Sequence, residues 1–437
     1  MHHRLRSLVV LTAAVLTLGP AALLAPAPTP VLAAAPTAQI TGVENKFPSE
    51  ILFTAEAASP GSRITSLRFH MTVGPGQAER LDNFEFTPGP QVTGKYTLKV
   101  AGNNYIPPGS TLTYWADAQD AAGATVISEK QTYWYADTRF QWSKLQEGTV
   151  TLYYYGAAER TARSVMQAAH EVQDNTGELL GVQGHPFTLM LYNTPSDIIG
   201  AQQVETSEKR SQELIRVGIA YPGSDLVQVL AASGFGGPDT TRHEVTHLFV
   251  SWAAGNGVPT WLNEGLAVWA QNDPGSDYRN SLDEAIKDDK LLLLRGMESF
   301  PGNSKDTLLA YGESWSAVKY LIDTYGRAKF REFYLSMGKI GTEPALKATF
   351  GVSYDELDAA WRKSVGAPPR SYAISRPTAI PVFGGGDAAD APKPAATPAP
   401  SGNAAAPLPM GALAAGGAVV LLVIAAGVFA STRKKAR

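Results

Sequence analysis

The sequence has no cysteine in its 437 residues and only 7 histidines. Without cysteine, the chain has neither disulfide bonds nor thiolate ligands, so histidine, aspartate or glutamate must hold any metal ion. An excess of one charge is also lacking, because 37 basic residues stand against 40 acidic residues and no long charged block occurs. This balance offers no basic surface to nucleic acid, and we expect no nucleic-acid partner.

The N-terminal end differs in composition from the body of the chain. Basic Arg4 and Arg6 precede an apolar run at residues 7–19, and small residues follow at 31–38. This order is typical of a secretory signal peptide, which we assign to residues 1–35. A retained N-terminal membrane anchor is the alternative, because the cleavage region is rich in proline and offers no clean site.

The C-terminal end predicts a membrane anchor. Residues 410–431 carry no charge and are mainly apolar, and the tail at 432–437 is basic. About 20 apolar residues suffice to cross a bilayer, and basic residues favour the inner side, so the body would face outward. A sortase sorting signal is the alternative, although residues 408–412 read L-P-M-G-A where that signal has threonine and then glycine.

Between these ends the pattern of residues changes once. Residues 37–142 contain short alternating runs rich in Val, Ile, Thr and Tyr between Gly/Pro turns, which predicts an Ig-like antiparallel β-sandwich. Strands at 149–155 and 187–192 then flank a helix at 157–180, and a last helix covers 353–364. We expect aromatic side chains of the sandwich to serve packing rather than as a carbohydrate platform: Trp115, Tyr133 and Trp134.

The segment H-E-V-T-H places His243 and His247 four residues apart. On a helix this spacing sets both imidazoles on one face, one turn apart, where they can share a metal ion. Glu244 lies next to the first histidine and could act as a general base on a water molecule at the metal. Catalytic zinc takes three protein ligands, and Glu264, separated from His247 by sixteen residues and at the start of another helix, could supply the third.

The pair H-E-V-T-H and W-L-N-E-G-L-A resembles the gluzincin peptidases, specifically the peptidase MA-like group related to aminopeptidase N, over roughly residues 148–365. The resemblance implies a thermolysin-like zincin domain, one Zn²⁺ held by His243, His247 and Glu264, and Glu244 as the base. The segment around Tyr311 is similar to the helix that carries the catalytic tyrosine in aminopeptidase N-like enzymes. This implies that the Tyr311 phenol stabilises the oxyanion.

Two departures from the family stand out. The Gly-x-Met-Glu-Asn segment that grips the free amine of an aminopeptidase substrate is absent, which leaves exopeptidase activity open. Thermolysin-like enzymes place an aspartate four residues after the glutamate ligand to orient a histidine, and here that residue is Val268. Another side chain must therefore fix the imidazole tautomer.

The sequence thus predicts an α+β chain: an N-terminal β-sandwich, a thermolysin-like zincin domain, a disordered linker and one transmembrane helix. The predicted segments are 1–35 (signal peptide), 36–142 (sandwich), 143–370 (gluzincin-like peptidase), 371–409 (Pro/Ala/Gly-rich linker), 410–431 (membrane helix) and 432–437 (cytoplasmic tail). We expect a membrane-anchored zinc metallopeptidase at the cell surface that hydrolyses peptides or proteins. The alternatives are an inactive zincin-fold surface protein that binds a partner, and a metal-dependent hydrolase of non-peptide amides or esters.

Overall fold

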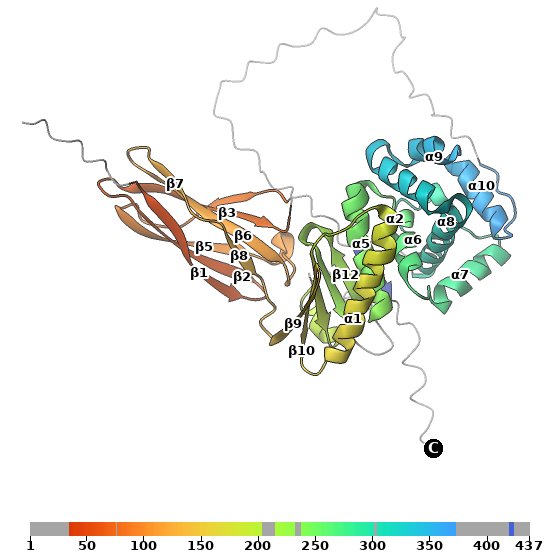
Figure 1. Cartoon of the computed structure of the whole chain (residues 1–437), viewed down its shortest axis with the longest axis horizontal. Coiled ribbons are helices and arrows are strands. Elements are labelled where there is room, and N and C mark those ends of the chain that lie inside the picture. The colour runs from red at the N-terminus through yellow and green to blue at the C-terminus, as the bar shows by residue number, and fades with distance from the viewer. Residues whose placement is uncertain are drawn as a thin grey trace, which may run out of the picture.

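The computed structural model describes residues 35–75, 77–202, 215–231, 237–300, 304–372 and 419–423. These residues form a β-sandwich and, beside it, a mixed portion that we name the α/β part, the described residues of 142–372 together with 419–423 (Figure 1). The mixed α and β content agrees with the predicted fold class. The predicted signal peptide lies outside the described residues except for residue 35, and so do most of the linker and the whole basic tail.

The β-sandwich consists of two antiparallel sheets with one apolar core between them. One sheet has the order β1-β2-β5, and the other has the order β4-β3-β6-β7, with β8 also paired to β6. Alternate residues of β2, such as Ile51 and Phe53, point inward, and the Phe53 ring lies 4.6 Å from the Phe69 ring of the facing sheet. The bounds are β1 Thr37–Lys46, β2 Glu50–Ala58, β3 Ile64–Val73, β4 Arg80–Asn83, β5 Gln91–Lys99, η1 Gly102–Asn104, β6 Thr111–Asp120, β7 Thr125–Ile127 and β8 Gln131–Trp134.

A mixed sheet forms the centre of the α/β part, in the order β14-β12-β13-β11-β10-β9. Strands β10, β11 and β13 run parallel to one another, and the other pairs are antiparallel. The predicted strands at 149–155 and 187–192 are found as β10 and β11. The bounds are β9 Trp142–Glu147, β10 Val150–Tyr155, β11 Phe187–Tyr192, β12 Ile215–Tyr221, β13 Leu226–Leu230 and β14 Val419–Val423.

Helices cover one face of this sheet and continue beyond it (Figure 1). Alternate strand residues such as Leu152 and Leu189 share a core with Ala169 and Leu248 of the two covering helices, α1 and α5. The helical bounds are α1 Glu159–Val172, η2 Gln173–Gly177, α2 Glu178–Leu180, α3 Pro195–Ile199, η3 Pro222–Ser224, α5 Pro238–Ala254, η4 Gly255–Gly257, α6 Thr260–Ala270, α7 Ser276–Lys287, η5 Leu294–Gly296, α8 Ser304–Ile340, α9 Thr342–Phe350 and α10 Tyr354–Ser364.

The sandwich packs against the opposite face of the sheet. Gly109, with φ of 103°, lies where a Cβ atom would come within 2.8 Å of the side chains of Met190 and Leu226. The buried Gln228 Nε2 donates a hydrogen bond of 3.0 Å to the carbonyl oxygen of Pro108. Trp134 stacks on Tyr153 with ring centroids 4.0 Å apart, which confirms its predicted packing role. The face that helices leave open is therefore closed by the sandwich.

The predicted membrane helix is described only at Val419–Val423, and there the structure differs from the prediction. These residues form the strand β14, which pairs antiparallel with β12. A run with three valines has high strand propensity, and the edge of β12 offers unpaired backbone groups to it. Among the described residues, no helix combines the length and apolar composition that a membrane crossing requires.

Candidate metal centre and active site

Helix α5 carries the two histidines of the H-E-V-T-H segment. It begins with Pro238 in its first turn, a position where the missing N–H of proline costs no helical hydrogen bond. Over the next turns the four-residue spacing brings the rings of His243 and His247 to a centroid distance of 4.9 Å, at 82° to each other. Both imidazoles are fully enclosed, with at most 1% of either residue exposed.

Helix α6 brings the third predicted ligand to the same point. Glu264 Oε2 lies 3.2 Å from His243 Nε2 and 3.7 Å from His247 Nε2. The ligand atoms of the three residues all lie within 4.8 Å of one another. The short η4 turn between α5 and α6 makes this return possible, because it sends the chain straight back along the first helix.

The three converging atoms fit a metal ion. Among the described residues, the structure gives no hydrogen-bond partner to His243 Nε2, His247 Nε2 or Glu264 Oε2, although all three are buried. Buried polar atoms are seldom left without a partner in a folded protein, and a cation at their meeting point would satisfy all of them. Two imidazoles and one carboxylate are also a donor set typical of catalytic zinc. These residues could therefore hold a divalent metal ion.

Burial also keeps both histidines in the neutral form that a metal ligand requires. Desolvation lowers the pKa of His243 to about 3 and that of His247 to about 4. Both rings are thus neutral at pH 7, and each keeps the lone pair that a metal ligand needs. Desolvation raises the pKa of Glu264, and a cation beside it would act in the opposite direction and favour the charged form.

Two amide side chains orient the histidine rings, and neither was predicted. Asn263 Oδ1 lies 2.8 Å from His247 Nδ1, and the amide nitrogen Nε2 of Gln271 lies 3.1 Å from His243 Nδ1. Val268, at the position of the missing aspartate, is instead buried in an apolar cluster with Tyr311. Asn263 could have been suspected from its place next to Glu264, whereas Gln271 follows the end of α6 and carries no local signal.

The two predicted catalytic residues, Glu244 and Tyr311, lie beside the three predicted metal ligands. Glu244 is fully buried on α5, between the two histidines in sequence. Tyr311 lies on α8 with its ring 6.2 Å from that of His243, and its hydroxyl donates a hydrogen bond to Glu264. Burial raises the pKa of Tyr311 well above its usual value, and the nearby Glu264 adds to this shift. The phenol is therefore a proton donor at every physiological pH.

Aromatic neighbours fix the Tyr311 ring. Tyr278 of α7 stacks on it with centroids 5.2 Å apart, and Phe300 meets it edge-on at 5.0 Å. Neither residue was predicted, because each comes from a segment that the motifs do not include. Held on two sides, the ring has little freedom to swing away from the histidines.

Strand β12 passes very close to Glu244. A Cβ atom at Gly218 would lie 2.7 Å from Glu244 Cγ and 2.6 Å from Thr240 Cγ2. Distances this short exclude a side chain at that position unless α5 moves away from the sheet. Glycine at 218 therefore allows the strand and the helix to enclose the Glu244 carboxylate.

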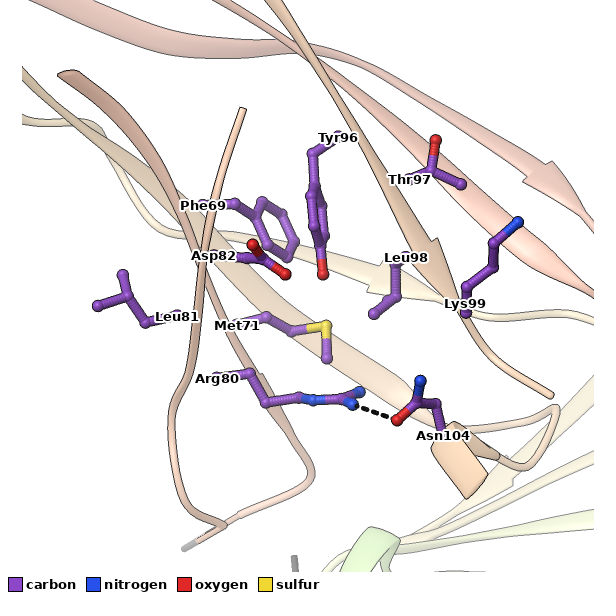
Figure 2. Close-up of a pocket in the computed structure, with 10 residues that line it drawn as sticks. All are labelled: Phe69, Met71, Arg80, Leu81, Asp82, Tyr96, Thr97, Leu98, Lys99 and Asn104. Atoms are coloured by element: carbon purple, nitrogen blue, oxygen red, sulfur yellow. Dashed lines mark hydrogen bonds between the residues drawn. The ribbon is translucent and has the colours of Figure 1, made fainter. Parts of the chain in front are cut away.

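A separate hollow of about 290 Å³ lies in the sandwich, between β4 and β5 (Figure 2). Phe69, Met71 and Leu98 line its inner wall, and polar side chains surround its mouth. The charged groups there already have partners in the chain: Arg80 donates to Asn104 Oδ1 at 3.3 Å, and Lys99 pairs with Glu50. The Tyr96 hydroxyl and the Asp82 carboxylate at this hollow are likewise hydrogen-bonded to each other. The buried ligand atoms that converge on one point belong to the centre on α5 and α6.

The comparisons with solved structures give only distant matches. A polysaccharide deacetylase from Bacillus cereus is 9% identical with a TM-score of 0.18, covering 38% of this chain and 54% of that one. An aminopeptidase A from Legionella pneumophila with bound aspartic acid is 10% identical with a TM-score of 0.29, covering 75% and 49%. A β-glucuronidase from Bifidobacterium dentium is 12% identical with a TM-score of 0.15, covering 36% and 30%. The chain thus spans about half or less of their lengths.

The family comparison is more informative. No curated protein matches the chain significantly. The model of the Peptidase MA superfamily, however, matches residues 149–367, which is half of the chain and includes every residue of the candidate centre. The chain belongs to the Peptidase MA superfamily.

Proposed function

We propose that the chain is a zinc-dependent peptidase that hydrolyses peptide bonds at the His243, His247 and Glu264 centre. The convergence of three buried ligand atoms that have no hydrogen-bond partner in the described part of the chain, beside a buried glutamate, carries the proposal. Zinc held by these residues would supply the Lewis acidity that activates water and polarises the scissile carbonyl. Membership of a peptidase superfamily supports peptide or protein as the substrate class.

Glu244 carries out both proton transfers, and Tyr311 stabilises the charge that develops on the substrate. Glu244 accepts a proton from the attacking water as the water oxygen bonds to the carbonyl carbon, and then delivers this proton to the leaving amine as the C–N bond breaks. Tyr311 donates a hydrogen bond to the oxyanion that develops on the carbonyl oxygen. Its strongly raised pKa supports this role, since the phenol keeps its proton throughout.

Replacement of Glu244 tests the proposed base. We expect E244Q to bind zinc as the wild-type chain does and to hydrolyse peptide about 10²–10⁴-fold more slowly, because the amide cannot accept a proton. The measurements are cleavage of a peptide library, read by mass spectrometry, and zinc content of the purified protein. E284Q makes the same replacement at an exposed glutamate on α7 and should leave both unchanged.

Each result separates the proposal from its rivals. Equal cleavage by E244Q and wild type would remove the base assignment. A wild-type chain that binds zinc and cleaves no peptide would favour the binding-protein alternative, and cleavage of esters alone would favour the non-peptide hydrolase. Activity should disappear with a chelator and return with added Zn²⁺.

We further propose that the enzyme is exported and anchored in the membrane by residues 410–431. The apolar, uncharged composition of this segment and the basic tail support the proposal. Anchoring requires Val419–Val423 to leave the edge of β12, because the same residues cannot lie in a bilayer and in the sheet. A chain that ends at residue 372 should be recovered in the soluble fraction with its activity intact. If the full chain and the chain that ends at residue 372 were recovered equally from membranes, residues 410–431 would not be the membrane anchor.

A further inference from the structure

The side chain of Gln271 contacts the first histidine of the candidate metal centre. Gln271 directly follows α6, and its backbone N–H donates to the carbonyl oxygen of Val268. From there its amide reaches across to His243 Nδ1 at 3.1 Å. The residue is only partly exposed, so the contact is shielded from bulk water.

The backbone that carries Gln271 is tied to helix α5 by a second contact. The N–H of Asn272 donates to Asp239 Oδ1 at 3.3 Å, and the same oxygen accepts a 2.7 Å hydrogen bond from Arg242. Asp239 lies in the first turn of α5, one turn before His243. The end of α6 is thus held to the helix whose histidine Gln271 contacts.

The chemistry of a neutral imidazole determines what Gln271 must offer. His243 Nε2 faces Glu264 Oε2 at 3.2 Å and is the atom directed to the metal position. A neutral ring that binds a metal through Nε2 carries its proton on Nδ1, and this N–H needs an acceptor. In the structure the amide atom nearest to Nδ1 is Nε2, and a half turn of the amide exchanges its nitrogen and oxygen, which brings Oε1 to Nδ1 as the acceptor.

We propose that Gln271 is the positioning residue of His243, accepting its Nδ1–H through Oε1 and so fixing the tautomer and orientation of the ring. The inference rests on the proposed zinc site. Val268, four residues after Glu264, is apolar and fully buried and offers no acceptor. Gln271 fills this role from one turn farther along the chain.

The assignment has an electrostatic consequence. Asn263 holds His247 and Gln271 holds His243, so both rings are oriented by neutral amides rather than by carboxylates. Glu264 is then the one anionic ligand in the predicted set of three. The orienting residues leave the charge of the metal less neutralised, which favours acidification of water.

Substitutions at 271 test the proposal through zinc binding. We expect Q271L, which has an apolar side chain of similar volume and no acceptor, to bind Zn²⁺ about 10–100-fold more weakly than the wild-type chain. Q271E restores an acceptor and should restore binding to the wild-type level or tighter. Zinc affinity is measured by competition with a chromophoric chelator, and N272A, an exposed neighbour whose backbone contact is retained, should bind as wild type does.

The outcomes separate this inference from the proposed function. Equal zinc affinity in Q271L and wild type, or equally weak binding by Q271L and Q271E, would overturn the positioning role. Thermal unfolding of the metal-free proteins checks folding, and a weakened Q271L with an unchanged metal-free Tm supports the role. A wild-type chain that binds no zinc would overturn the proposed zinc site itself.

Discussion

At the scale of single residues, burial sets the charge of the groups around the centre. The enclosed histidines are neutral and the enclosed Tyr311 keeps its proton, so each has the form that its proposed role requires. Glu313, on the same helix as Tyr311, is buried as well. Its Oε1 accepts a 2.8 Å hydrogen bond from the N–H of Leu292, and burial raises its pKa to about 8, with Asp358 acting in the same direction.

Because the pKa of Glu313 is raised in the folded chain, we expect the free energy of unfolding to fall as the pH rises. Between the unfolded value near 4.5 and the folded value of about 8, the folded chain holds a proton on Glu313 that the unfolded chain has lost. The free energy of unfolding should therefore fall by up to about 1.4 kcal/mol per pH unit across this window. E313Q keeps the acceptor without the charge and should flatten the fall, as measured by urea unfolding from pH 5 to pH 8.

The exposed E284Q serves as the matched control and should follow the wild-type curve. If E313Q and wild type lost stability equally with pH, another group would have to carry the effect. A chelator added to all proteins keeps the test independent of zinc binding.

Sequence alone was sufficient to select the residues that meet at the centre, but not their supports. Two histidines at helical spacing and a glutamate after a short turn meet because local geometry brings them together. The orienting role of Gln271 depends on how the end of α6 returns to α5, which no local pattern encodes. Tyr278 likewise reaches Tyr311 from another helix.

At the scale of secondary-structure elements, close contacts between helices hold the ligands in place. Gly265, next to the ligand Glu264, lies against α8: a Cβ atom there would fall on the carbonyl group of Ser314 and within 2.8 Å of Val318 Cγ2. Gly312, next to Tyr311, lies against the carbonyl oxygen of Tyr278 in the same way. Small residues thus let α6, α7 and α8 approach around the centre.

Replacement of Gly265 by alanine tests this contact. Alanine normally favours a helix over glycine by about 1 kcal/mol, but here the methyl group has no room. We expect G265A to lower the free energy of unfolding of the metal-free protein by about 1–3 kcal/mol and to weaken zinc binding, because Glu264 shifts with α6. Urea unfolding and chelator competition measure the two effects.

Gly257 provides the control, since a Cβ atom there would meet nothing within 4 Å. G257A should be neutral or slightly stabilising. A G265A protein more stable than wild type would show that α6 and α8 can separate at no cost, contrary to the packing described.

The elements themselves were predicted where the local pattern is strong. The helix at 353–364 is found as α10, whose capping box joins Ser353 and Glu356. The predicted helix at 157–180 contains an unpredicted π-helical turn, η2. There Gly177 lies against Phe249 of α5, a tertiary contact that periodicity does not report.

At the scale of the whole molecule, the sandwich acts as one of the two layers that cover the central sheet. The contacts are buried and partly polar: besides Gln228 and Pro108, the Tyr105 hydroxyl donates to the carbonyl oxygen of Ala201 at 2.7 Å. Met190, Tyr192 and Leu226 of the sheet lie in the same apolar cluster as Trp134 and Phe140. The sandwich and the sheet are therefore expected to move together.

Truncation tests this arrangement. A fragment of residues 143–372 would expose the aromatic face of the sheet, whereas a fragment of residues 35–372 keeps it covered. We expect the longer fragment to be monomeric and cooperative in unfolding, and the shorter one to aggregate or to lose much of its thermal stability. Light scattering and calorimetry check this. A monomeric short fragment with an unchanged Tm would mean that the sandwich does not contribute to the stability of the α/β part.

The packing of the loop that ends at Gly109 limits which part of the chain can be transferred to another protein. The family match begins at residue 149, yet the wall that closes the back of the matched sheet is made by residues more than thirty positions earlier. The segment that the family model matches is thus shorter than the set of residues that enclose the sheet. Grafting the matched segment onto another protein would require a new cover for Met190 and Leu226, or their replacement by polar residues.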